Sequence, residues 1–404
     1  MLSFDVAAAA GLASMEEALL SADVGLEWLG VEPAQIEQRQ VGFWVQERLA
    51  DGQTVRVPAQ AELLPNPGGR VMLTWLAPRS ASASRRVRLE LAERGNGKAL
   101  PFPAVQVLPD AIDRVLVSHD SRDLLGYCYS GQYRKPFFYP VNGPSGRSVT
   151  RLGHPRDFGG GHDHHRSLWI EHENVNDVCF ETEHLHFFAG TDSPLVGIGR
   201  IEHDRFLRQE DGPVYARLEM ALAWVSHEGE VLLNEIRRVR VCPLAGGEQL
   251  IDFDLTFAPR VEQVTFGQST FGILAARVAH SLESGRGGGR IVNARGALNE
   301  EEVHLRRAEW CDYAGPISPT ETNGIAILGH PENLHYPHTW HVRDDGWMCA
   351  APFGRHAKTI HSGETLNFRF RVFVHGGDDA ARVAARHAEF AQPTAVSVSE
   401  GEGG

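Results

Sequence analysis

Short segments in which apolar and polar residues alternate recur along this chain. Two of the clearest run from Ile251 to Phe257 and from Leu366 to Val372, where every second residue is apolar. A period of two sends successive side chains to opposite faces of a β-strand, so each segment is expected to bury one face. Turn residues separate such segments roughly every 8–12 residues. The pattern predicts a mainly β protein, built as a large antiparallel β-sandwich with few helices.

The remaining patterns divide the chain into sections. Residues 1–20 and Asp378–Phe390 are expected to be helical, and residues 393–404 are expected to form a disordered tail. The segment Gly95–Pro103, rich in glycine and proline, marks a boundary. We therefore predict a β-rich N-terminal section at residues 1–108 and a main domain at residues 109–392. The first section is either a small sandwich of its own or part of the main sheets.

Charge and cysteine usage restrict the partners and the compartment. The 404 residues carry 39 basic and 52 acidic side chains, a net charge of −13 that repels nucleic acids and anionic lipid surfaces. The first 20 residues contain no Lys or Arg, so a secretion signal is not expected. The five cysteines include no C-x-x-C pair. We predict a cytoplasmic protein that binds neither nucleic acid nor membrane.

The histidines are the most unusual feature of the composition, because seven of the 20 are concentrated in one stretch. They are His154, His162, His164, His165, His172, His184 and His186. An extended backbone would send His162 and His164 to one face and His165 to the other. An irregular backbone after the glycines at 159–161 could instead turn several imidazoles into one pocket, as a metal site or an acid/base site requires. Isolated histidines are more often structural, but the clustering favours function.

Two further groups of polar residues attract attention. The segment His338–Met348 places His341, Arg343 and Asp344 between two tryptophans, a mixture that can bind sugar hydroxyls and stack on a sugar ring. An ordinary hairpin turn is an equally good interpretation of it. In the second group, Glu235 and Arg237 lie two residues apart on a predicted strand. A solvated salt bridge is favoured there over a catalytic pair.

Three motifs resemble one family in their order and spacing. They are PFFYPVNGPSG at 136–146, GHDHHRSLW at 161–169 and WHVRDDGW at 340–347. The match extends over residues 110–376 and resembles the PmoA-like family, labelled methane oxygenase PmoA and counted as a domain of unknown function. That name fits poorly, since this chain shows no membrane-spanning stretch. The histidine segment is more distantly similar to galactose-mutarotase-like sugar enzymes, which implies a β-supersandwich with His and Glu acid/base groups.

These observations lead to a first hypothesis, a carbohydrate-processing enzyme of sugar catabolism. It would be an epimerase, lyase or glycoside hydrolase that uses acid/base chemistry next to a carbonyl or hemiacetal carbon. The expected catalytic residues are His164, His165, His172, Glu171 and His341. The expected substrate-binding residues are Arg166, Trp169, Asn176, Glu235, Arg237, Arg343, Asp344 and Trp347.

Two alternatives stay open. One is a metal-dependent hydrolase or lyase, in which His162, His164, His165 and either His172 or Glu171 hold one divalent metal ion. The other is a non-catalytic sugar-binding or regulatory protein. All three hypotheses give the protein a small-molecule carbohydrate as its partner, and none of them predicts the oligomeric state.

Overall fold

The structure, a computed structural model, describes residues 2–7, 17–49, 51–65, 69–78, 85–153, 162–184 and 194–400. Strands account for 55% of the described residues and helices for 9%, so the predicted mainly β, antiparallel, sandwich-like fold is confirmed. The chain divides into two compact units. Unit 1 comprises residues 1–106, 211–216 and 384–404, and unit 2 comprises residues 107–210 and 217–383. The division into sections at residues 108 and 109 stays a prediction.

Unit 1 contains a seven-stranded sheet. Its strands, in spatial order, are β2 (Glu17–Gly25), β5 (Arg70–Pro78), β4 (Thr54–Leu63), β3 (Val41–Arg48), β6 (Arg85–Glu93), β1 (Leu2–Val6) and β28 (Val396–Glu400). Alternate residues of β3 are buried, as a strand with one wet face requires. Trp75 of β5 stacks on Phe4 of β1 with ring centroids 5.7 Å apart, in the core of this sheet.

Both ends of the chain differ from the prediction. Residues 1–20 were expected to be helical, but the described parts belong to β1 and β2, while residues 8–16 lie outside the described chain. Residues 396–400 were expected to be disordered, but they form β28 and pair with β1 in antiparallel register. The apolar residues of β1 satisfy a period of two as well as a helical one. The pairing partner comes from the opposite end of the sequence, where no local pattern reveals it.

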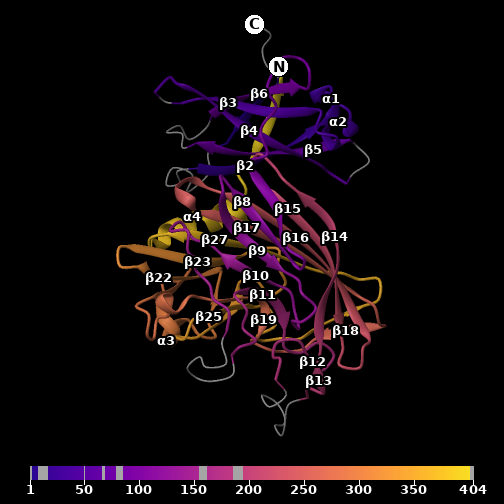
Figure 1. Cartoon of the computed structure of the whole chain (residues 1–404), viewed down its shortest axis with the longest axis vertical. Helices are drawn as coiled ribbons and strands as arrows, with labels where there is room; N and C mark the ends of the chain where they lie inside the picture. Colours follow the sequence, from indigo (N-terminus) through magenta and orange to yellow (C-terminus); the bar gives the residue numbers. More distant parts are fainter. Residues whose placement is uncertain are drawn as a thin grey trace. The chain divides into compact units, whose positions relative to one another are not determined.

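Unit 2 contains two large sheets, and most of their strands are labelled in Figure 1. The nine-stranded sheet is ordered β21 (Arg307–Ala308), β24 (His338–Val342), β25 (Trp347–Ala351), β19 (Gly272–Arg277), β11 (Leu168–His172), β10 (Phe137–Val141), β9 (Arg122–Cys128), β8 (Arg114–His119) and β7 (Val105–Ala111). The eight-stranded sheet is ordered β14 (Arg200–Glu210), β15 (Ala216–Val225), β16 (Val231–Pro243), β17 (Gln249–Pro259), β27 (Leu366–Gly376), β23 (Glu321–Gly329), β22 (Trp310–Ser318) and β20 (Arg290–Asn293).

The smaller elements complete the description. Two short sheets pair β12 (Val178–Cys179) with β13 (Gly197–Ile198) and β18 (Gln263–Phe266) with β26 (Lys358–His361). The helices are α1 (Leu26–Leu29), α2 (Pro33–Glu37), α3 (Asn299–Val303) and α4 (Ala380–Ala391), with 3-10 turns η3 (Ala245–Gly247) and η4 (His280–Leu282). The predicted helix at Asp378–Phe390 is therefore confirmed as α4. Among the described residues, no helix is both long and apolar enough to cross a membrane.

Aromatic side chains join the two large sheets of unit 2. Phe138 of β10 meets Phe253 of β17 edge to face, with ring centroids 5.3 Å apart. His338 of β24 lies 5.5 Å from the ring of Phe370 on β27. The alternation that predicted β17 and β27 is confirmed, and these two strands pair with each other in the eight-stranded sheet. One face of the nine-stranded sheet therefore lies in the sandwich core, and its other face is available for a site.

Candidate functional site

A row of directly paired residues crosses the outer face of the nine-stranded sheet. Trp169 of β11 is paired with Phe137 of β10 on one side and with Ala275 of β19 on the other. The row continues through Cys349 of β25 to His341 of β24. Because directly paired residues share a face, His341 lies on the same face as Trp169. We call this surface the site face.

The predicted residue His172 lies on the opposite face of β11. It follows Trp169 by three positions, and the odd spacing turns its side chain into the sandwich core. Its ring contacts Phe353 at 4.9 Å and Phe266 at 5.7 Å, and its Nε2 faces the Gly267 carbonyl oxygen at 2.9 Å. The prediction that His172 joins the histidine cluster is therefore wrong.

The segment before β11 is irregular, and it gathers three of the predicted histidines. One ligand nitrogen from each of His162, His164 and His165 lies within 4.8 Å of the others. A turn closed by a hydrogen bond from the main-chain nitrogen of His165 to the main-chain oxygen of His162 breaks the alternation that would have separated them. The sequence allowed either an extended or an irregular backbone here, and the structure has the irregular one. His154 and His186 lie outside the described residues.

Trp169 and Trp347 enclose the innermost histidine. The His165 ring stacks on Trp169, with centroids 5.2 Å apart and planes inclined by 22°. Trp347 approaches the same ring to 4.3 Å and also contacts His341 at 4.4 Å. Trp347 thus contacts the rings of His165 and His341. His341 does not belong to the group of three convergent histidines. Both predicted tryptophans line the cluster.

Glu181 connects two histidines through a single oxygen. Its Oε1 lies 3.0 Å from Nε2 of His164 and 3.3 Å from Nε2 of His165. An ionised carboxylate only accepts hydrogen bonds, so each imidazole donates from Nε2 and keeps the lone pair on Nδ1. Nδ1 of His165 is buried and has no hydrogen-bond partner in the part of the chain that the structure describes. Glu181 was not identified from the sequence.

The protonation states follow from burial and from this contact. Burial lowers the pKa of His165 well below its usual value, and the nearby His164 lowers it further. Burial, reinforced by Arg277, also lowers the pKa of His162. Burial would raise the pKa of Glu181, but its contacts with His164 and His165 outweigh that effect and hold it well below normal. At neutral pH His162 and His165 are therefore neutral imidazoles near an ionised Glu181 carboxylate.

A buried ion pair lies next to Glu181. Nζ of Lys135 contacts both Oε2 of Glu171 and the main-chain oxygen of Glu181. Both charged side chains are at most 1% exposed. Burial raises the pKa of Glu171, although the ion pair with Lys135 opposes this shift. The contact ties the segment that carries Glu181 to β11. Lys135 was missed because a lone lysine carries no local signature.

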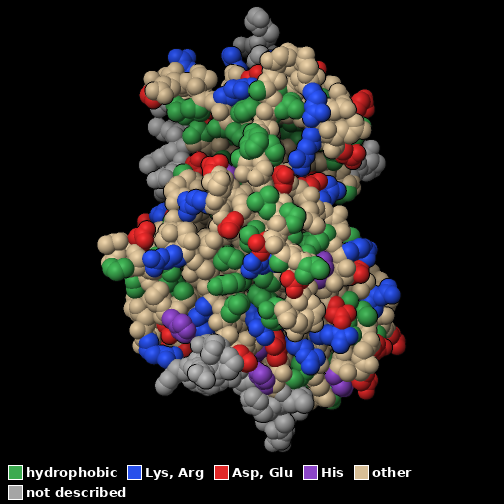
Figure 2. Space-filling model, viewed as in Figure 1, with side chains coloured by type: hydrophobic (Ala, Val, Ile, Leu, Met, Phe, Trp, Pro, Cys, Tyr) green, Lys and Arg blue, Asp and Glu red, His purple; other side chains and the backbone are tan. Residues whose placement is uncertain are grey.

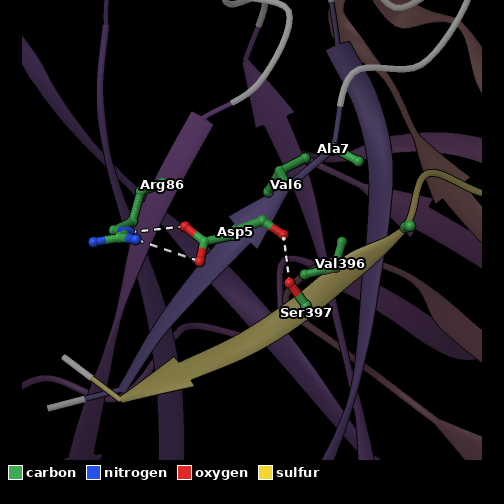
Figure 3. Close-up of a pocket in the computed structure, with 7 residues that line it drawn as sticks. Asp5, Val6, Ala7, Arg86, Val396 and Ser397 are labelled. Atoms are coloured by element: carbon green, nitrogen blue, oxygen red, sulfur yellow. Dashed lines mark hydrogen bonds and ion pairs between the residues drawn. The ribbon is translucent and has the colours of Figure 1, made fainter.

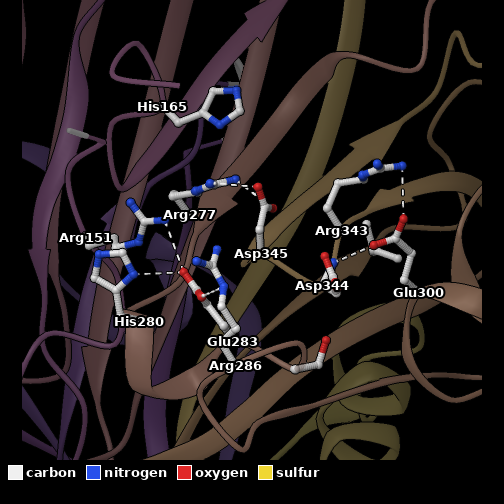
Figure 4. Close-up of polar contacts among 12 residues, drawn as sticks. Arg151, His165, Arg277, His280, Glu283, Arg286, Glu300, Arg343, Asp344 and Asp345 are labelled. Atoms are coloured by element: carbon white, nitrogen blue, oxygen red, sulfur yellow. Dashed lines mark hydrogen bonds and ion pairs between the residues drawn. The ribbon is translucent and has the colours of Figure 1, made fainter. Parts of the chain in front are cut away.

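Arg277 and Asp345 form a second pair on this face. Two guanidinium nitrogens of Arg277 each donate to one oxygen of Asp345 at 3.0 Å. Figure 4 shows this pair beside His165 and, apart from it, an ion pair between Arg343 and Glu300. The closest nitrogen and oxygen of that second pair are 3.0 Å apart. The main-chain nitrogen of Asp344 also donates to Glu300. Asp345, rather than the predicted Arg343 and Asp344, therefore lies nearest the histidines.

Other predicted substrate-binding residues have structural partners. Glu235 and Arg237 are fully buried and bond to each other at 2.6 Å, so the predicted salt bridge is present but is not solvated. The side chain of Asn176 donates a hydrogen bond to the main-chain oxygen of Gln263 and accepts one from the main-chain nitrogen of Thr265. None of these three belongs to the histidine cluster.

Arg166 lies next to the cluster and makes two contacts. It pairs with Glu183 at 2.8 Å, and its guanidinium carbon lies 4.6 Å from the centre of the Tyr133 ring. The Glu183 contact holds the histidine segment against residues 181–184, and the Tyr133 contact holds it against the chain before β10. Arg166 thus has a positioning role in the structure.

A family model matches residues 114–389, and the match includes most of both segments of unit 2. The chain belongs to DUF6807, a family of unknown function. The histidine cluster, Lys135, Glu181 and the site face all lie within the DUF6807 segment. This match supports neither the PmoA-like name nor the likeness to galactose-mutarotase-like enzymes, and both stay predictions. A comparison with curated proteins finds no match.

An open hollow lies in unit 1, and its lining residues are outside the DUF6807 segment. It measures about 510 Å³ and is lined mainly by β1, β6 and β28, with Asp5 and Arg86 paired at 2.7 Å (Figure 3). None of its lining residues belongs to the histidine cluster.

Basic and acidic side chains are interspersed on the face seen in Figure 2.

Proposed function

We propose that this protein is a metal-dependent enzyme of the hydrolase or lyase type, in which His162, His164 and His165 hold a divalent ion. The observation that carries the proposal is the buried lone pair on Nδ1 of His165, which lies in a group of three convergent histidines. Three protein ligands with an open fourth position are typical of catalytic zinc sites. Neutral imidazoles are the form that binds the metal.

Glu181 fits the role of the carboxylate that orients metal-binding histidines. Such histidines commonly donate their second ring N–H to a carboxylate, which fixes the tautomer and makes the ligating nitrogen more basic. Oε1 of Glu181 is placed to accept from both His164 and His165. Lys135 in turn holds the main-chain oxygen of Glu181. A bound divalent ion would polarise a carbonyl oxygen of the substrate or activate a water molecule.

A carbohydrate is the proposed substrate class. Aromatic rings and planar charged groups bind sugars by stacking and by paired hydrogen bonds. Trp347 and the Arg277–Asp345 pair supply these two kinds of group beside the histidines. The reaction would then be hydrolysis or elimination next to a carbonyl or hemiacetal carbon.

Acid/base catalysis without metal is the second candidate, and the raised pKa of Glu171 favours it. A buried carboxyl group whose pKa is raised toward neutrality can act as a general acid. In this scheme His164 or His165 would accept the proton. The two candidates differ in their dependence on a metal ion.

The test combines metal content with turnover. Untagged protein is purified without chelators, its metals are measured by mass spectrometry, and aldoses, glycosides and keto-sugars are screened by NMR. We expect bound metal in the wild type and in His227→Gln, whose side chain is exposed in the β15–β16 turn, and loss of metal in His165→Gln. Turnover should disappear after chelation and return with metal.

Other results would overturn this assignment. Full turnover by metal-free protein would favour the acid/base candidate. Saturable sugar binding without any product would indicate a non-catalytic protein.

A further inference from the structure

Glu173 follows β11 directly and is held by the segment that precedes β19. Its main-chain nitrogen donates to the main-chain oxygen of Phe271 at 3.0 Å. Its side-chain Oε2 accepts a hydrogen bond of 2.5 Å from Oγ of Ser269. We infer that Glu173 is the residue that takes protons from the substrate or the attacking water and returns them to the leaving group. This inference rests on the proposed function and deepens it.

The segment 269–271 places Glu173 on the site face. Phe271 stacks on Trp347, with ring centroids 5.1 Å apart and planes inclined by 15°, and its ring lies 4.9 Å from that of His341. Trp347 also contacts the histidine cluster. The segment that bonds to both the main chain and the side chain of Glu173 is therefore packed against the residues of the site face.

Glu173 differs from Glu171 in its access to solvent. Glu171 is fully buried, and Lys135 contacts its Oε2. Glu173 is half-buried, and among the residues that the structure describes none donates a hydrogen bond to its second oxygen, Oε1. One oxygen of Glu173 thus fixes the orientation of the carboxylate, while the other can reach a bound molecule. A general acid or base needs this combination of fixed geometry and access.

The surroundings of Glu173 make it a stronger base than an ordinary carboxylate. Burial raises the pKa of Glu173, the hydrogen bond from Ser269 opposes this shift, and the negative charge of Glu181 adds to it. The Cys179 thiol, which also interacts with Glu173, stays neutral because burial raises its pKa to about 12. A carboxylate with a raised pKa accepts a proton more readily.

The same carboxylate serves both reactions of the proposed function. In hydrolysis, Glu173 accepts a proton from water while the water oxygen bonds to the substrate carbon. The bond from that carbon to the leaving oxygen breaks, and Glu173 gives the proton to this oxygen. In elimination, the proton comes from the carbon next to the carbonyl, the electron pair of that bond forms a double bond, and the leaving hydroxyl group takes the proton and departs as water. Glu173 ends each reaction ionised, so no other co-reactant is needed.

The test compares Glu173→Gln with the wild type and with Glu228→Gln, whose side chain is exposed in the β15–β16 turn. The substrate is the sugar that the wild type turns over in the NMR screen. Circular dichroism and metal analysis verify that each protein is folded and holds the same metal as the wild type. We expect Glu173→Gln to keep its metal and to lose about 100-fold or more in kcat, because general acid–base catalysis contributes about 10²–10⁴-fold. Glu228→Gln should match the wild type.

A second variant, Ser269→Ala, gives a readout that a merely structural role would not move. Loss of its hydrogen bond should raise the pKa of Glu173, because that bond lowers it in the wild type. The acid limb of the pH profile of kcat/KM should therefore move to higher pH, with turnover retained above it. The residual activity of Glu173→Gln should lack this limb.

The alternative outcomes separate the two proposals. Wild-type turnover by Glu173→Gln, or an unchanged acid limb in Ser269→Ala, would overturn the inference and leave the proposed function standing. Loss of metal from Glu173→Gln would make Glu173 part of the metal site and would also overturn the inference. Absence of metal or of turnover in the wild type would contradict the proposed function itself.

Discussion

Both faces of β11 carry polar side chains, but these side chains have different surroundings on the two faces. On the site face, Glu171 meets the side chain of Lys135, and Trp169 stacks on His165. On the core face, His172 contacts phenylalanine rings, and its Nε2 faces the main-chain oxygen of Gly267. Both faces are buried. The position of a residue along the strand, rather than its type, therefore decides whether its polar group lies on the site face or in the core.

The largest expected effect is on the site face, at Lys135. Lys135→Met leaves the Glu171 carboxyl buried without its partner, which typically costs about 3–5 kcal/mol of stability. The free energy of unfolding in urea measures the loss. Adding Glu171→Gln should restore a large part of it, because the uncompensated charge is removed. A loss below about 1 kcal/mol in the single variant would show that the pair is not buried as described.

The core face should make the protein sensitive to acid. Burial lowers the pKa of His172 to about 4 and that of His338 to about 3, both below the ordinary value of 6.5. Below pH 6.5 the unfolded chain therefore binds protons that the folded protein excludes. Stability should be complete above pH 6.5 and fall by about 1.4 kcal/mol per pH unit for each histidine.

Urea unfolding at pH 7, 6 and 5 checks this dependence. His172→Phe should reduce the slope by one histidine, or about 2 kcal/mol between pH 6.5 and pH 5. His227→Gln is the matched control, since its side chain is exposed. An unchanged slope in His172→Phe would mean that His172 takes up its proton in the folded state.

The smallest effect is expected at the margin of the site face. Arg343 pairs with Glu300, but its side chain is 48% exposed, and exposed pairs contribute about 0–1 kcal/mol. Arg343→Ala should therefore change stability by less than about 1 kcal/mol and leave metal binding unchanged. Urea unfolding and metal analysis measure both quantities. A loss of metal would place Arg343 in the site after all.

Much of the fold could be predicted from the sequence, because the strands obey local rules. The alternation predicted strands at Ile251–Phe257 and Leu366–Val372, and the structure contains them as parts of β17 and β27. The strand pairing of the termini was not foreseen, since β1 and β28 lie at opposite ends of the sequence. Local patterns say which segments are strands, but not which distant strands become neighbours.

The candidate site was only partly predictable, for the same reason. His162, His164 and His165 are close in sequence, and one irregular segment brings them together. Lys135 and Arg277 come from other strands and loops, so their positions depend on sheet order. The burial of Glu235 and Arg237 did have a signal: Val239 and Val241 continue their face of β16 and are also buried. The alternation along β16 thus places Glu235 and Arg237 on its buried face.

The most direct test of a metal ion on the site face is calorimetric titration of chelator-treated protein with Zn²⁺, in His165→Gln and His172→Gln beside the wild type. The two variants remove a histidine from opposite faces of the same sheet region. We predict that the wild type and His172→Gln bind Zn²⁺ and that His165→Gln loses the ion held by His162, His164 and His165. Equal binding by all three proteins, or none by the wild type, would contradict this account.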